Sequence, residues 1–167
     1  MRYQVVVLDS EIGTAITIED LLWKRAPMGE DHGSYNNFKI YMGYTTLDAL
    51  GTNFESNYVP SSKTLVFNRS TYTLSGIGPN QWFTTALDTP FFYNGSNNLL
   101  IDIEWTATPD SQSVYVYNWT GADGRSVFCS PDGQPSGGLE STVPHWILGG
   151  TNDLDNATFA SIKYLFE

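Results

Sequence analysis

The sequence predicts an all-β fold: an antiparallel two-sheet β-sandwich of jelly-roll type, in a single domain spanning residues 1–167. Segments that alternate apolar and polar residues recur along the chain, and they indicate about ten short strands. Polar connections rich in Gly, Pro, Asn and Ser separate these segments. The apolar period of about 3.6 residues that marks a helix is almost absent, so we expect at most one or two helical turns.

The segment 89–105, TPFFYNGSNNLLIDIEW, contains the clearest strand. Its alternating apolar positions are Leu99, Ile101, Ile103 and Trp105. Successive side chains of a strand point to opposite faces, so we expect this set to enter a core while Asp102 and Glu104 face water. Asn94-Gly95 predicts a tight turn before the strand. Pro90 is expected to end the preceding strand, because it has no N–H to donate to a neighbour.

The other elements follow from the same patterns. Strands are expected at 2–8, 16–25, 37–44, 63–67, 71–74, 81–87, 113–119, 125–130, 145–148 and 159–166. A single helical turn is expected after Asp9, and Gly13 stops it. One or two further turns are expected over 45–51, where Leu47 and Leu50 are spaced i, i+3 between a Thr N-cap and a Gly.

The chain is acidic, with a formal net charge of -10 and a pI near 4.4. An acidic surface repels phosphate backbones, so we expect no nucleic acid partner, whereas divalent cations are compatible with it. Only 16% of the residues are charged, and Ser, Thr, Asn and Gly take their place, which favours a secreted β-protein. The single Cys129 excludes an internal disulfide and is expected to be a buried, inert thiol.

Location follows from two further observations. No apolar run is long enough to span a bilayer, so we expect no membrane span. A strand pattern begins directly after Met1, without the basic and apolar regions of a signal peptide. The protein is therefore either cytosolic or a mature or trimmed form of an extracellular or cell-surface protein, and the composition favours the second.

Four patches carry a resemblance to a known kind of module. They are RYQVVVLDSEIG at 2–13, YNNFKIYMGYTTLDALGTNF at 35–54, TPFFYNGSNNLLIDIEW at 89–105 and SIKYLF at 161–166. Together they resemble a β-sandwich (jelly-roll) module of bacterial secreted and cell-surface proteins, of the adhesin-like or carbohydrate-binding kind. The resemblance implies an extracellular, non-enzymatic role, and these motifs carry no catalytic residues.

Catalytic residues are not expected. His32 lies in a polar loop and His145 begins a strand, and no nucleophile-elbow, HExxH or CxxC pattern accompanies them. Asp102 and Glu104 lie two apart on one strand face, about 7 Å apart by strand rise. That spacing resembles the carboxylate pair of a glycoside hydrolase. A solvated strand face explains the two carboxylates more simply.

A calcium site is the one cofactor that the sequence suggests. Asn152, Asp153 and Asp155 concentrate side-chain oxygens in one turn, and calcium binds six to eight oxygen ligands. The spacing departs from an EF-hand loop, because there is no central Gly and no terminal Glu. An ordinary Asx-rich turn explains the residues equally well.

Three aromatic residues form the sharpest candidate binding site. Tyr115, Tyr117 and Trp119 share one face of the predicted strand 113–119, and valines take the other face. If the valines enter the core, the rings face outward and can stack on sugar rings or contact another subunit. In the opposite arrangement the rings form the core. The pattern leaves both alternatives open.

The two terminal strands are candidates for self-assembly. Tyr3, Val5 and Val7 lie in the first strand, and Ile162, Tyr164 and Phe166 lie in the last. Edge strands expose unpaired N–H and C=O groups that can pair with a neighbouring chain. We therefore expect homo-oligomers or fibres with the terminal segments at the contacts.

These observations favour a non-catalytic extracellular structural or interaction protein, a subunit or module of a surface layer, fibre or adhesin that self-associates. The alternative is a carbohydrate-binding module that uses the aromatic strand face to bind a polysaccharide, with calcium as a stabilising ion. A hydrolase that uses Asp102 and Glu104 is the third hypothesis. Solution size and glycan titration distinguish the three.

Overall fold

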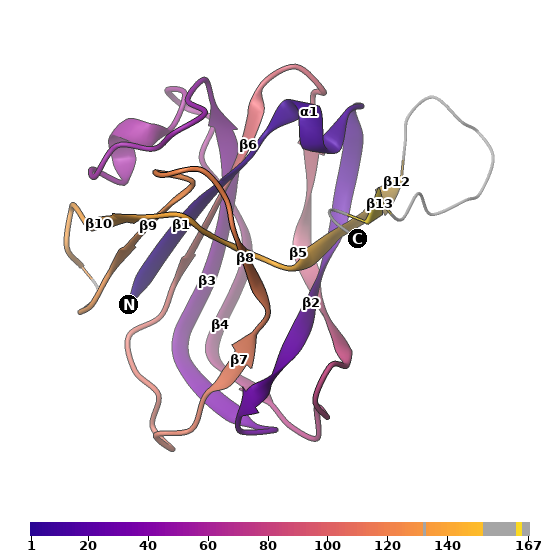
Figure 1. Ribbon diagram of the computed structural model, residues 1–167, viewed down its shortest axis with the longest axis vertical. Coiled ribbons are helices and arrows are strands. Elements are labelled where there is room, and N and C mark those ends of the chain that lie inside the picture. Colours follow the sequence, from indigo (N-terminus) through magenta and orange to yellow (C-terminus); the bar gives the residue numbers. More distant parts are fainter. Residues whose placement is uncertain (132, 152–162, 165–167) are drawn as a thin grey trace.

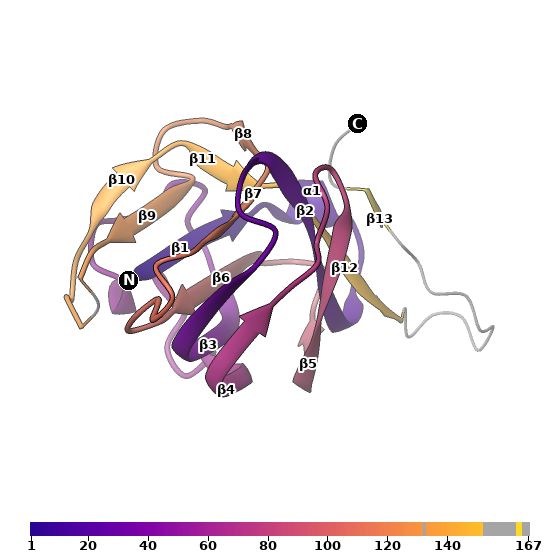
Figure 2. The same cartoon turned by 90° about the horizontal axis from the view of Figure 1, so that it is seen from below.

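The computed structural model describes residues 1–131, 133–151 and 163–164, which fold into antiparallel sheets packed against each other (Figures 1 and 2). The larger sheet has the order β10 (Gly138–Glu140), β9 (Ser126–Cys129), β1 (Arg2–Val7), β6 (Asn98–Glu104), β3 (Gly33–Thr45), β4 (Thr64–Leu74). The smaller sheet has the order β13 (Lys163–Tyr164), β12 (Trp146–Thr151), β2 (Ile16–Gly29), β5 (Trp82–Tyr93), and β7 (Val114–Val116) pairs with the end of β2. β8 (Asn118–Thr120) and β11 (Thr142–Pro144) form a separate two-stranded ribbon. The predicted antiparallel β-sandwich is confirmed, and its jelly-roll connectivity stays a prediction.

Helix is confined to two short pieces of the described chain, α1 (Asp9–Ile12) and the 3-10 turn η1 (Glu55–Asn57). α1 ends as predicted at Gly13, whose φ of 78° a glycine adopts without strain. The helical turn predicted over 45–51 is wrong. Thr45 stays paired with Asn98 as the last residue of β3, and its hydroxyl accepts the N–H of Leu47 at 3.1 Å, which makes a bend instead.

β2, β3, β4 and β5 are longer than predicted, with 14, 13, 11 and 12 residues. β4 joins the strands predicted at 63–67 and 71–74. β5 continues past Pro90, so the prediction that this proline ends a strand is wrong. Its position explains why it is tolerated: in the described chain β5 pairs with β2 alone, and the register shifts between Ile18 and Asp20, opposite Pro90.

The main core lies between the two sheets. Leu99, Ile101 and Ile103 are buried as predicted, and Trp105 packs half-buried against the same cluster. The facing strand β2 supplies the fully buried Ile18 and Leu21, and the neighbouring strand β3 supplies Ile40 and Met42. Burying one such aliphatic side chain is worth about 1.5–3 kcal/mol relative to leaving it exposed. Burial of this set therefore holds the sheets together.

β1 is an interior strand, so the prediction that Tyr3, Val5 and Val7 lie at an assembly edge is wrong. The strand pairs along its length with β6 and, from Arg2 to Val5, with β9. The physical reason is in its sequence: consecutive valines make both faces apolar, which is typical of a strand covered on both sides. Tyr164 lies in β13, which pairs with β12 at one end of the smaller sheet. Ile162 and Phe166 lie outside the described residues.

A second, smaller core covers the outer face of the larger sheet. Its buried members are Val6, Leu50, Phe54, Leu100, Val127 and Cys129. The chain between β3 and β4 lies over this face, and Tyr58 packs against it. Gly43 of β3 permits the close approach, because a Cβ there would stand 2.7 Å from the Tyr58 ring. β6 is therefore buried on both faces, and the thiol of Cys129 is buried as predicted.

Candidate ligand-binding pocket and neighbouring surface

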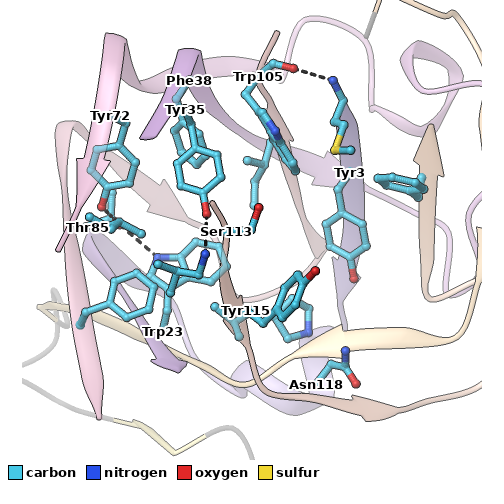
Figure 3. A pocket seen from close by; sticks show the side chains of 18 of the residues that line it. Tyr3, Trp23, Tyr35, Phe38, Tyr72, Thr85, Trp105, Ser113, Tyr115 and Asn118 are labelled. Atoms are coloured by element: carbon cyan, nitrogen blue, oxygen red, sulfur yellow. Dashed lines mark hydrogen bonds between the residues drawn. The ribbon is translucent and has the colours of Figure 1, made fainter. Parts of the chain in front are cut away.

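A pocket of about 500 Å³ lies between the two sheets at the end where β7 crosses (Figure 3). Tyr35, Phe38, Tyr72 and Trp105 project into it from the larger sheet, and Trp23 faces them from the smaller sheet. β7 and the β8–β11 ribbon complete its wall. The lining is therefore rich in aromatic rings.

The pocket rings support one another. Phe38 stacks on Trp105 with ring centroids 6.1 Å apart and lies 5.0 Å from Tyr72. Tyr35 meets Trp105 edge-on at 6.0 Å, and its hydroxyl accepts the N–H of Val114 at 3.0 Å, which fixes β7 across the pocket. Rings in these offset and edge-on arrangements gain about 0.5–1.5 kcal/mol a pair beyond their burial. They keep the wall in place and leave space between the sheets.

Polar groups of the pocket wall are already hydrogen-bonded within the protein. The Trp23 indole donates to the Thr85 hydroxyl at 3.1 Å, and Tyr72 shares that hydroxyl at 2.9 Å. The Tyr3 hydroxyl donates to the carbonyl of Thr142 at 2.6 Å. Burial raises the pKa of Tyr3, Tyr35 and Tyr72, so these phenols stay neutral at physiological pH. Apart from the Met1 ammonium, which donates to the Trp105 carbonyl, the wall offers a ligand an uncharged, largely apolar surface.

Tyr115 borders both the pocket and the solvent, with 55% of its surface exposed. Its ring lies against Gly29, where a Cβ would come within 2.7 Å of the ring, and Gly29 has a φ of 76°. Both facts require glycine at this position. Asn118, which also lines the pocket, is exposed. These two residues place a hydroxyl and an amide where the pocket meets water.

The predicted row of three rings does not form. The predicted strand 113–119 is broken at Tyr117 into β7 and β8, which pair with β2 and β11 respectively. Tyr115 lines the pocket, whereas Trp119 packs half-buried against the main core with the Arg125 guanidinium 5.2 Å from its ring centroid. Tyr117 stacks on His145 at 5.9 Å, away from the pocket lining. The structure thus separates the three residues into three environments.

Asp102 is fully buried, so the prediction that it faces water is wrong. Arg2 donates to it twice, at 2.9 and 2.5 Å, and Gln4 and Tyr58 donate at 3.2 and 2.9 Å. In the register of the sheet Gln4 lies opposite Asp102, so polar residues of β1 and β6 meet on the outer face. The chain at 54–58 then covers them. Four hydrogen bonds compensate the buried charge.

Glu104, the other carboxylate of the predicted pair, has different partners. Lys39 and Tyr41 donate to it at 3.1 and 3.2 Å. Both Asp102 and Glu104 are thus held in ion pairs. The two histidines also have different partners. His32 hydrogen-bonds to Asp31 at 2.7 Å, and the His145 ring packs on Tyr117.

Neither a metal-binding cluster nor a helix that could span a membrane is found in the described part of the chain. Within residues 1–131, 133–151 and 163–164, no three His, Cys, Asp or Glu side chains gather where they could hold a metal ion. The calcium residues Asn152, Asp153 and Asp155 lie outside the described residues, so that hypothesis stays a prediction. Of the described helices, none has the length and apolar character needed to cross a membrane.

Comparisons with known proteins do not extend the resemblance noted in the sequence. No protein-family model matches the chain, and neither the curated proteins nor the solved structures gave a match. What the structure supports of the resemblance is the all-β, sandwich-like fold. The pocket could not have been found by motif, because its rings come from strands far apart in the sequence, each with only one or two contributors.

Proposed function

We propose that this protein is a non-catalytic binding module whose inter-sheet pocket holds a small, uncharged, ring-bearing apolar molecule. The observation that carries the proposal is the pocket of about 500 Å³, rich in rings, in which Trp23, Tyr72 and Thr85 hydrogen-bond to one another. Ligand sites typically have volumes of roughly 300–1,000 Å³ and a mostly apolar lining. The pocket falls within this range.

The chemistry of the lining supports binding rather than turnover. Among the described residues that form the wall, none is Asp, Glu, Lys, Arg, His or Cys. The wall contains Ser and Thr hydroxyls and neutral phenols, but no His, Lys or carboxylate side chain of the lining lies beside them to act as a base. A charged ligand would lose its hydration without gaining an ion pair, so the favoured ligand is uncharged.

An extracellular or cell-surface setting remains part of the proposal, and the low charged content supports it. Self-association is a second candidate, favoured by β4 and β5, which lie at sheet edges. Asp88 limits it, because its carboxylate accepts the backbone N–H of Asn68 at 3.0 Å and bonds Arg69 at 2.7 Å. Edges bridged in this way are less open to another chain.

The test uses N-phenylnaphthylamine, an uncharged ring probe whose fluorescence rises in apolar surroundings. We expect saturable binding at one site. Val116→Trp adds a ring to the pocket wall and should abolish the binding, whereas Leu65→Trp adds the same ring to an exposed position of β4 and should not. Absence of saturable binding, or equal binding by both variants, would contradict the proposal.

A further inference from the structure

We propose a second site on the outside of the smaller sheet, where Lys24, Trp82, Tyr117 and Asn80 receive a ring that carries a carboxylate. This site shares no residue with the pocket lining and does not depend on it. Its parts come from β2, from β5 and the turn before it, and from the residue that links β7 and β8 (Figure 1).

Lys24 is an accessible cation in a strongly acidic chain. The chain carries 18 acidic residues against 8 Lys and Arg. In its described part, Arg2, Lys39, Lys63, Arg69 and Arg125 each have a carboxylate within salt-bridge distance. Lys24 and the adjacent Arg25 have none among the described residues. In such an acidic molecule an unpaired cation is the exception, and Lys24 is the one of these two that is not buried.

Arg25, the next residue of β2, is held apart from the proposed site by its own contacts. It is only 3% exposed, and it donates to the carbonyls of Gly29 and Glu30 at 2.8 and 3.2 Å. Its remaining terminal nitrogen has no hydrogen-bond partner in the described chain. The charge of Arg25 acts on Asp31 in the adjoining loop, so Lys24 is the accessible cation at this end of β2 that can meet an anion.

Two aromatic rings, those of Trp82 and Tyr117, lie beside Lys24. Its ammonium lies 5.8 Å from the ring centroid of Trp82 and 5.5 Å from that of Tyr117. Trp82 is directly opposite Lys24 in the sheet and is 40% exposed. An exposed indole face beside a cation can stack on a ring while the cation meets the carboxylate.

Backbone hydrogen bonds hold the residues of the site in place. The Lys24 N–H donates to the His145 carbonyl at 3.2 Å, the His145 N–H to the Tyr117 carbonyl at 2.7 Å, and the Tyr117 N–H to the Lys24 carbonyl at 2.8 Å. This closed set of three bonds fixes the backbones of the residues that carry the site. A site that is already ordered loses less entropy when a ligand binds.

Hydrogen-bonding groups complete the site. The Tyr117 hydroxyl donates to the Asn80 side-chain carbonyl at 2.6 Å, which leaves the amide N–H group of the exposed Asn80 available for a ligand oxygen. Burial and then the charge of Lys24 lower the pKa of His145, so this imidazole is neutral at pH 7. Lys24 therefore carries the positive charge that meets the ligand.

The experiment titrates the protein with sodium glucuronate, glucose and benzoate, followed by the amide and indole signals in heteronuclear NMR. We expect saturable shifts at Lys24 and Trp82 with a carboxylate ligand, and at least tenfold weaker binding of glucose. Tighter binding of glucuronate identifies the ligand as an acidic sugar, and tighter binding of benzoate identifies it as an aromatic acid. Either outcome supports the site and identifies the chemical class of its ligand.

Variants test the roles separately. Lys24→Met keeps the aliphatic stem and should reduce carboxylate binding at least tenfold, whereas Lys39→Met removes a cation paired with Glu104 and should leave binding unchanged. Trp82→Ala should weaken the binding of both glucuronate and benzoate. Val116→Trp, which blocks the pocket, should have no effect here. No saturable shift with either acid, or equal affinity in wild type and Lys24→Met, would overturn the site while leaving the pocket proposal intact.

Discussion

The two faces of the larger sheet bury their residues in opposite ways. On the inner face, near β7, neutral rings surround a space of about 500 Å³. On the outer face, Asp102 and Arg2 are buried as charged groups, and four hydrogen bonds surround the carboxylate. Apolar atoms tolerate an adjacent space, since they need no particular partner, whereas a buried charge needs every partner in place. The inner face therefore has space for the ligand that we propose, whereas removal of a side chain from the outer-face cluster should destabilise the fold strongly.

The largest expected effect comes from Asp102→Ala. Removing one member of a buried ion pair leaves Arg2 without its main partner, and the free energy of unfolding should fall by about 3–5 kcal/mol. Asp102→Asn keeps the volume and one acceptor oxygen, so its loss should be smaller. Urea denaturation of both variants measures the difference.

Asp88→Ala is the surface control for this comparison, because the Asp88–Arg69 pair is exposed to solvent. Its loss should be much smaller than that of Asp102→Ala. Equal losses for the two would show that the outer-face cluster is hydrated in solution, which would remove the contrast between the faces.

The next effect compares two neighbouring core positions on the inner face. Ile101 is fully buried, whereas Ile103 borders the pocket. Ile101→Ala should reduce the free energy of unfolding by about 2–5 kcal/mol, and Ile103→Ala should lie at the lower end of this range, because Ile103 has fewer neighbours on its pocket side. Thermal and urea denaturation give both values. If Ile103→Ala is the more damaging, the pocket is closed in solution.

The smallest effect is alkaline destabilisation, to which one tyrosine of the main core and one packed against the second core contribute. Burial raises the pKa of Tyr93 from 10.0 to about 12, and burial followed by the negative charge of Asp102 raises that of Tyr58. A raised pKa stabilises the folded state below pH 10 and loses that contribution as the pH rises toward 12. Tyr93 alone should account for a loss of about 1 kcal/mol one pH unit above its unfolded value.

Stability measured by urea denaturation at rising pH, with tyrosinate absorbance as the second signal, checks this prediction. Tyr58→Phe removes the tyrosine next to Asp102 and should flatten the pH dependence. A profile that is level through the alkaline range would show that these phenols ionise without unfolding the chain.

Sequence reasoning predicted the fold from local alternation, and it succeeded where one face of a strand is apolar. Leu99, Ile101 and Ile103 were assigned correctly for this reason. It failed at Asp102, because alternation says which residues share a face but not what covers that face. The cover comes from the chain between β3 and β4, and no local pattern links Tyr58 to Asp102.

The candidate site was predicted only in part. Tyr115 was identified as a binding residue and does line the pocket. The predicted row with Tyr117 and Trp119 requires one straight strand. Instead, β7 pairs with β2 and β8 pairs with β11, so the strand is interrupted at Tyr117. The exposure of Trp82 cannot be predicted from local alternation, because it depends on the place of β5 at the edge of its sheet and on what covers its outer face. The exposure of such residues can be determined only from the tertiary structure.

The interior place of β1 constrains how the chain can fold. Arg2 pairs with Glu104 on one side and with Cys129 on the other, so the strand meets its neighbours only after most of the chain has been synthesised. Contacts so distant in sequence slow folding, because long loops must close first. Until then, three consecutive valines stay uncovered in a segment that favours β-structure, which makes the nascent chain prone to aggregation and a candidate for chaperone binding.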